Sequence, residues 1–195
     1  MKKIALTSLL AVFAISSANA ATNYFVGGGL AMMTDNEHDS SLLLTPEFGW
    51  KLNSNWDLGV MANFGYDHHY EGTDDGLYQY GAGAFARYKV AQAGRAKLLL
   101  KGGAEVEFGT VSSEDDAIDG ETFTSIRAAI IPMVTYDISE SFTLYANLNF
   151  LGVYAGYTFE NEDLGMKESW NMGAIADSND VMNTGDFQIG FIYNF

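Results

Sequence analysis

The chain of 195 residues contains no cysteine and only two prolines. The absence of cysteine excludes a disulfide framework, a zinc–thiolate site and a thiol nucleophile. Charged residues are also scarce, at 18 % of the chain against roughly 25 % in an average soluble domain. The formal charge of −15 argues against a nucleic-acid partner, because lysine and arginine are needed to neutralise phosphates. The 21 glycines and the 14 % of aromatic residues point instead to β structure.

The first twenty residues have the pattern of a secretory signal peptide. Two lysines at 2–3 precede an apolar stretch over 4–15, and residues 16–20 end in the small-x-small pattern of a signal-peptidase site. An apolar run of about 12 residues is too short for a membrane-spanning helix, which needs about 20. We therefore expect export, cleavage near Ala20 and one mature domain over residues 21–195.

Eight segments of the mature chain alternate apolar and polar residues with a period of two, which is typical of β-strands. The clearest is the C-terminal FQIGFIYNF, in which Phe191, Tyr193 and Phe195 share one face. Each segment reaches the roughly 9–11 residues that a tilted strand needs to cross a bilayer. The segments span residues 22–32, 42–52, 56–66, 77–89, 96–109, 123–136, 142–158 and 187–195.

The connections between these segments alternate in length. The short ones are residues 53–55, 90–95 and 137–141. The long, polar ones are residues 33–41, 67–76, 110–122 and 159–184. Short turns on one side and long loops on the other are the arrangement of outer-membrane barrels. We predict an all-β fold, an eight-stranded antiparallel transmembrane β-barrel with an up-and-down meander and both termini on the periplasmic side.

The positions of the charged residues support this assignment of inward and outward faces. The long loops hold most of the acids and a single base, Lys167. The inward faces hold the bases Lys51, Arg87, Lys89, Lys97, Lys101 and Arg127 and the acids Glu47, Asp57, Glu105, Glu107 and Asp186. A one-residue slip would place each buried base in hydrocarbon at about 2–4 kcal/mol near the bilayer midplane. Hairpin geometry places Lys51 opposite Asp57, and Glu105 opposite Arg127.

These features resemble the small outer-membrane β-barrel proteins of the opacity-porin type and the OmpA membrane domain. The resemblance covers the whole mature chain, and its most specific part is the terminal strand ending in Phe195. It implies the outer membrane of a Gram-negative bacterium, contact with outer-membrane lipids and lipopolysaccharide, and recognition of the C-terminal strand by the barrel-assembly machinery.

Candidate chemistry is sparse. The three histidines, His38, His68 and His69, all lie in long loops. With neighbouring acids they offer a site for a divalent cation, although solvated loop histidines are the simpler interpretation. The acidic loop 110–122 does not match the EF-hand spacing. We assign no catalytic, cofactor or metal residue.

The expected function is that of a non-enzymatic outer-membrane barrel. A lipid-modifying enzyme would need an activated nucleophile, and the sequence has neither a strand histidine nor a Gly-x-Ser-x-Gly elbow. We expect acidic surface loops that serve envelope integrity or adhesion to a host or cell-surface ligand. The alternative is a narrow cation-favouring porin. Because Phe85, Arg87 and Tyr145 point inward in an interior just wide enough for side chains, we predict a plugged lumen.

Overall fold

The computed structural model describes residues 23–34, 40–68, 76–113, 118–162, 164–175 and 187–195. The predicted signal peptide, residues 1–20, lies outside these residues. Within them, no helix is long and apolar enough to cross a membrane. The described strands are β1 (Tyr24–Thr34), β2 (Ser40–Lys51), β3 (Trp56–Asp67), β4 (Gly76–Ala93), β5 (Ala96–Ser112), β6 (Thr122–Asp137), β7 (Phe142–Leu148), β8 (Gly152–Thr158), β9 (Ser169–Ile175) and β10 (Phe187–Asn194).

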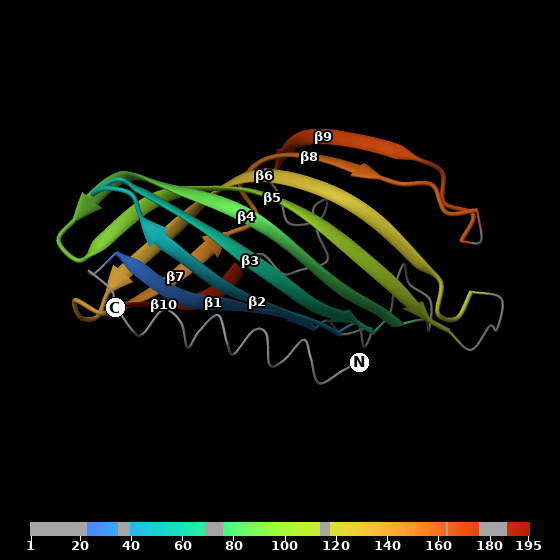
Figure 1. Cartoon of the computed structure of the whole chain (residues 1–195), viewed down its shortest axis with the longest axis horizontal. Coiled ribbons are helices and arrows are strands. Elements are labelled where there is room, and N and C mark those ends of the chain that lie inside the picture. Colours follow the sequence, from blue (N-terminus) through green and yellow to red (C-terminus); the bar gives the residue numbers. More distant parts are fainter. Residues whose placement is uncertain (1–22, 35–39, 69–75, 114–117, 163, 176–186) are drawn as a thin grey trace.

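Eight of these strands close into an antiparallel barrel. Strands β1 to β6 each pair with the next strand in sequence, and β10 pairs with β7 on one side and β1 on the other. Figure 1 shows β1, β7 and β10 together toward the end that carries the C-terminus. A closed ring satisfies the backbone hydrogen bonds that an open sheet would leave unpaired in lipid. The predicted eight-stranded antiparallel barrel is confirmed.

The seventh predicted segment is divided in two, and a further strand lies within the loop predicted to follow it. Segment 142–158 breaks between β7 and β8, which pair with successive parts of β6. At the break, Gly152 has a φ of 156°, and a Cβ there would overlap the Ile130 carbonyl oxygen. The prediction of a loop over the whole of residues 159–184 is wrong, because this range contains β9, which pairs antiparallel with β8. Its alternation of Trp170, Met172 and Ala174 is too short to stand out between polar flanks.

The two faces of the barrel wall carry different residues, as predicted. Leu30, Leu44 and Phe64 point outward and are exposed, whereas Phe25 and Arg87 point into the lumen and are buried. The described strands carry no charged residue on their outward faces. An apolar exterior is what a hydrocarbon solvent requires, so the register suits a membrane-embedded wall.

Paired aromatic rings mark both ends of the β3–β4 hairpin. Trp56 packs on Tyr88, and Tyr66 packs on Tyr78, each with ring centroids 4.8 Å apart. The two levels are ten residues apart on β3, or about 33 Å along a strand at roughly 3.3 Å per residue. A strand tilted by about 40° converts that length to about 25 Å of height, the thickness of the apolar band.

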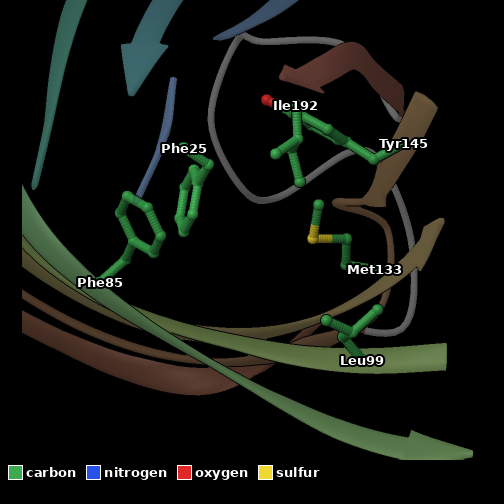
Figure 2. Close-up of a cluster of buried hydrophobic side chains, with 6 residues drawn as sticks. All are labelled: Phe25, Phe85, Leu99, Met133, Tyr145 and Ile192. Atoms are coloured by element: carbon green, nitrogen blue, oxygen red, sulfur yellow. The ribbon is translucent and has the colours of Figure 1, made fainter. Parts of the chain in front are cut away.

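The lumen is filled by apolar side chains near its middle. Figure 2 shows the buried cluster of Phe25, Phe85, Leu99, Met133, Tyr145 and Ile192, with the first two rings side by side. The rings of Phe25 and Phe85 lie where a Cβ on Gly49 or on Gly59 would overlap them. These inward-facing glycines therefore give an eight-stranded interior room for large rings.

Candidate functional site

A buried ionic cluster crosses the lumen beside these rings. Glu47 on β2 accepts hydrogen bonds from Arg87 on β4 and from Lys101 on β5. The Lys101 Nζ lies 2.5 Å from the Glu47 Oε1. The three residues are 2 %, 0 % and 7 % exposed, in the order Glu47, Arg87 and Lys101. Two cations thus share one buried carboxylate.

Aromatic faces compensate the second positive charge. The Arg87 Cζ lies 4.5 Å from the ring centroid of Phe85, 5.3 Å from that of Phe25 and 5.6 Å from that of Tyr145. The Lys101 Nζ lies 5.1 Å from the Phe85 centroid. These distances are within the range of cation–π attraction. We call the set that closes the lumen the lumen plug: Phe25, Glu47, Phe85, Arg87, Lys101 and Tyr145.

One cavity of about 130 Å³ lies on the side of the plug that faces the long loops. We call it the loop-side cavity; its polar lining includes Asn63, Gln79, Lys101, Glu105, Glu107, Arg127 and Gln188. Glu105 is opposite Arg127 in the ladder, so the predicted register is confirmed. The ion pair, however, is diagonal: the Arg127 Nη1 lies 3.8 Å from the Glu107 Oε2. Glu105 instead accepts a hydrogen bond from the Asn63 Nδ2.

A second cavity of about 200 Å³ lies on the side of the plug that faces the short turns. We call it the turn-side cavity; its lining includes Lys51, Asn53, Asp57, Lys89, Lys97, Thr135, Thr143 and Asn194. The predicted opposition of Lys51 and Asp57 is confirmed in the ladder. The two cavities share no lining residue, which places the lumen plug between them.

The predicted loop sites are described only in part. His38 and His69 lie outside the described residues, as do residues 114–117 of the acidic loop. His68 is described, and its ring meets Tyr66 edge to face at 6.4 Å. Within the described part of the chain, no group of three or more histidines and acids could hold a metal ion.

The pairing within the plug is the feature that sequence reasoning missed. Glu47 lies 40 residues from Arg87 and 54 residues from Lys101. The alternation places all three side chains inside the barrel, but no local spacing tells which charges meet across it. The usable signal was coarser: an inward-facing acid among inward-facing bases must find a partner, because an unpaired buried charge is costly.

The architecture defines a small closed antiparallel barrel of the outer-membrane type. No protein-family model matches the chain, and no curated protein sequence matches it. Among solved structures, it is similar to Neisserial surface protein A, with a TM-score of 0.56, 15 % identity, and coverage of 90 % of this chain and 98 % of that chain.

Two further structures have lower scores. The major outer membrane protein of Thermus thermophilus has a TM-score of 0.43 and 15 % identity, and the alignment covers 90 % of this chain and 100 % of that protein's chain. Ail, the attachment invasion locus protein of Yersinia pestis, has a TM-score of 0.42 and 14 % identity, and the alignment covers 89 % of this chain and 97 % of the Ail chain. The likeness to the Neisserial protein confirms the predicted resemblance at the level of fold.

Proposed function

We propose that the protein is a non-enzymatic outer-membrane barrel that displays acidic loops at the cell surface for adhesion or envelope integrity. The observation that carries this proposal is the lumen plug, which separates two cavities and fills the middle of the barrel. An eight-stranded interior leaves little room beyond its own side chains. A barrel with a filled lumen is suited to displaying its loops at the surface rather than to conducting ions.

The loop end supports a surface role. The exposed acids there include Asp119, Glu160 and Glu162, and the base in this region is Lys167. The tip between β8 and β9 is anchored to the wall, since the Asn161 Nδ2 donates to the Thr122 carbonyl oxygen at 2.9 Å. An acidic surface of this kind attracts cationic ligands or divalent cations. The Neisserial protein of similar fold is, by name, a surface protein.

The membrane partners follow from the outward face and the C-terminal strand. An apolar wall with aromatic levels suits outer-membrane lipids and lipopolysaccharide. Phe195 remains half-exposed beside Tyr193, with ring centroids 5.3 Å apart, at the end of β10. We include in the proposal that the barrel-assembly machinery recognises this strand, and that the short turns face the periplasm.

Planar-bilayer recording tests the non-conducting barrel. We expect no steady current from the folded wild-type protein. The Phe85→Ala/Arg87→Ala variant opens the plug and is expected to conduct, whereas Arg127→Ala removes a lumen charge outside the plug and should remain silent. Heat-modifiable gel mobility establishes that each variant is folded. Steady currents from the wild-type protein would favour the cation-favouring porin and overturn the proposal.

Binding of a fluorescent oligolysine to intact cells tests the acidic surface. We expect Glu160→Gln/Glu162→Gln to weaken binding and to reduce its dependence on salt, because exposed charges are screened. The matched control is Glu105→Gln/Glu107→Gln, which removes the same charge inside the lumen. An equal effect of the two variants would mean that binding does not depend on the displayed acids.

A further inference from the structure

The turn-side cavity has a charge opposite to that of the chain as a whole. The protein has 25 acids against 10 bases, yet three of the bases, Lys51, Lys89 and Lys97, line this one cavity. Asp57 is the single acid among its lining residues. A concentration of cations in an acidic chain costs mutual repulsion unless an anion compensates it. The cavity therefore has the charge of a site for an anion.

The internal pairing leaves part of this charge available. The Lys97 Nζ lies 2.5 Å from the Asp137 Oδ2. The Lys89 Nζ donates a hydrogen bond to a neutral group, the Gln92 Oε1 at 3.1 Å. Among the described residues, neither Lys51 nor Asp57 forms an ion pair within 4.0 Å. Even with Asp137 counted, the bases exceed the acids.

The plug adds to the positive potential of the cavity. Phe25, a member of the plug, lines the cavity as well. Arg87 stacks on its ring, and Arg87 and Lys101 together outnumber their shared partner Glu47. Arg87 is also opposite Asp57 in the β3–β4 ladder. The Arg87 guanidinium is thus one ring away from the turn-side cavity, where low dielectric strengthens its effect, whereas Lys101 lines the loop-side cavity.

Two buried polar atoms show that the cavity is built for a hydrogen-bonding occupant. Thr135 is 2 % exposed, and its Oγ1 has no hydrogen-bond partner among the described residues. The Asn194 Oδ1 is likewise buried without a partner in this part of the chain. Both residues line the cavity. Buried polar groups are normally satisfied, so an unpaired hydroxyl and an unpaired amide oxygen in residues that line the same cavity favour a polar occupant there.

We propose that the turn-side cavity binds a small hydroxylated phosphate. Lys51 and Lys89 face the phosphate charge, the Thr135 hydroxyl donates to a phosphate oxygen, and the Asn194 Oδ1 accepts from a ligand hydroxyl. A volume of about 200 Å³ leaves room for a short polyol beside the phosphate. The closed strand wall separates the cavity from lipid, so the ligand enters from solvent past the turn at 53–55.

Calorimetric titration with glycerol 3-phosphate, in a zwitterionic detergent, tests the site. We expect saturable one-to-one binding to the folded protein and none with glycerol. Lys51→Met should weaken binding about tenfold, because a charge-assisted contact is lost. Lys167→Met is the matched control, since it removes the same charge from the exposed loop end.

Thr135→Val separates ligand binding from folding. The substitution keeps the shape and removes a buried hydroxyl that has no partner among the described residues, so the barrel should fold as well as the wild type. Binding of glycerol 3-phosphate should still weaken severalfold. Absence of saturable binding to the wild-type protein would overturn the proposal. So would unchanged affinity in both Lys51→Met and Thr135→Val, or an equal loss in Lys167→Met.

Discussion

Arg87 on β4 reaches Glu47 on β2 across the lumen, although β3 lies between these two strands in the barrel wall. The contact is made possible by curvature, because inward-facing side chains of next-nearest strands converge in a small barrel. Lys101 on β5 reaches the same carboxylate from still farther around the ring. One acid thus links β2 to two strands with which it shares no ladder, β4 and β5, on which Arg87 and Lys101 lie opposite each other.

Removing that acid should be the most damaging single charge change in the lumen. We expect Glu47→Gln to lower the free energy of unfolding by about 3–5 kcal/mol, because two buried cations lose their carboxylate. Urea unfolding in lipid vesicles measures the change. Glu107→Gln is the control, since the Glu107–Arg127 pair is longer and partly exposed. Equal losses from the two substitutions would show that the plug does not depend on Glu47.

Arg127 should couple more strongly to its diagonal neighbour than to the residue opposite. The Glu107 carboxylate lies 3.8 Å from Arg127, while Glu105 is hydrogen-bonded to Asn63. Double-mutant cycles with Arg127→Met and either Glu107→Gln or Glu105→Gln give the two coupling energies. We expect the Glu107 cycle to give about 0.5–1 kcal/mol and the Glu105 cycle less. A larger coupling for Glu105 would contradict the diagonal pair.

The packing of the Phe123 ring should require a glycine at position 109 in the neighbouring strand β5. A Cβ on Gly109 would overlap the Phe123 ring, so Gly109→Ala should destabilise the barrel by about 1–3 kcal/mol through overpacking. Adding Phe123→Leu should recover much of this loss. Gly102→Ala is the control, because its Cβ would meet only Ile130 at 3.7 Å. Failure of the second substitution to rescue would place the strain in the backbone.

Loss of the last residue should impair assembly more than a change in a loop tip. Phe195 continues the aromatic face of β10, and its backbone N–H donates to the Tyr24 carbonyl oxygen at 3.2 Å. Deleting Phe195 is therefore expected to reduce the folded barrel recovered in outer-membrane fractions. Replacing residues 162–165 by a Gly-Ser tetrapeptide keeps β9 and should have little effect, because such tips tolerate change. Equal yields from both variants would count against the terminal strand as an assembly signal.

The sequence by itself determined the class of fold and the face on which each strand residue lies. Alternation with a period of two separates outward residues such as Phe64 from inward residues such as Asn63, and lipid outside the wall makes that pattern strict. The ladder opposition of Lys51 with Asp57 followed from the short turn at residues 53–55, because a short turn determines the register of its own hairpin. The opposition of Glu105 with Arg127 followed from placing the tip of that hairpin at the middle of the long loop 110–122.

Tertiary structure alone decided which inward residues meet. The contact of Glu47 with Arg87 and Lys101 depends on how the wall curves. Arg127 lies nearest to the Glu107 carboxylate, while the Glu105 carboxylate accepts a hydrogen bond from Asn63 on β3. The division of segment 142–158 into β7 and β8, and the presence of β9, likewise depend on pairing with β6 and β8 rather than on local pattern. Such contacts join residues far apart in the chain. Their energies depend on burial in the lumen, which forms only when all the strands have closed into the barrel.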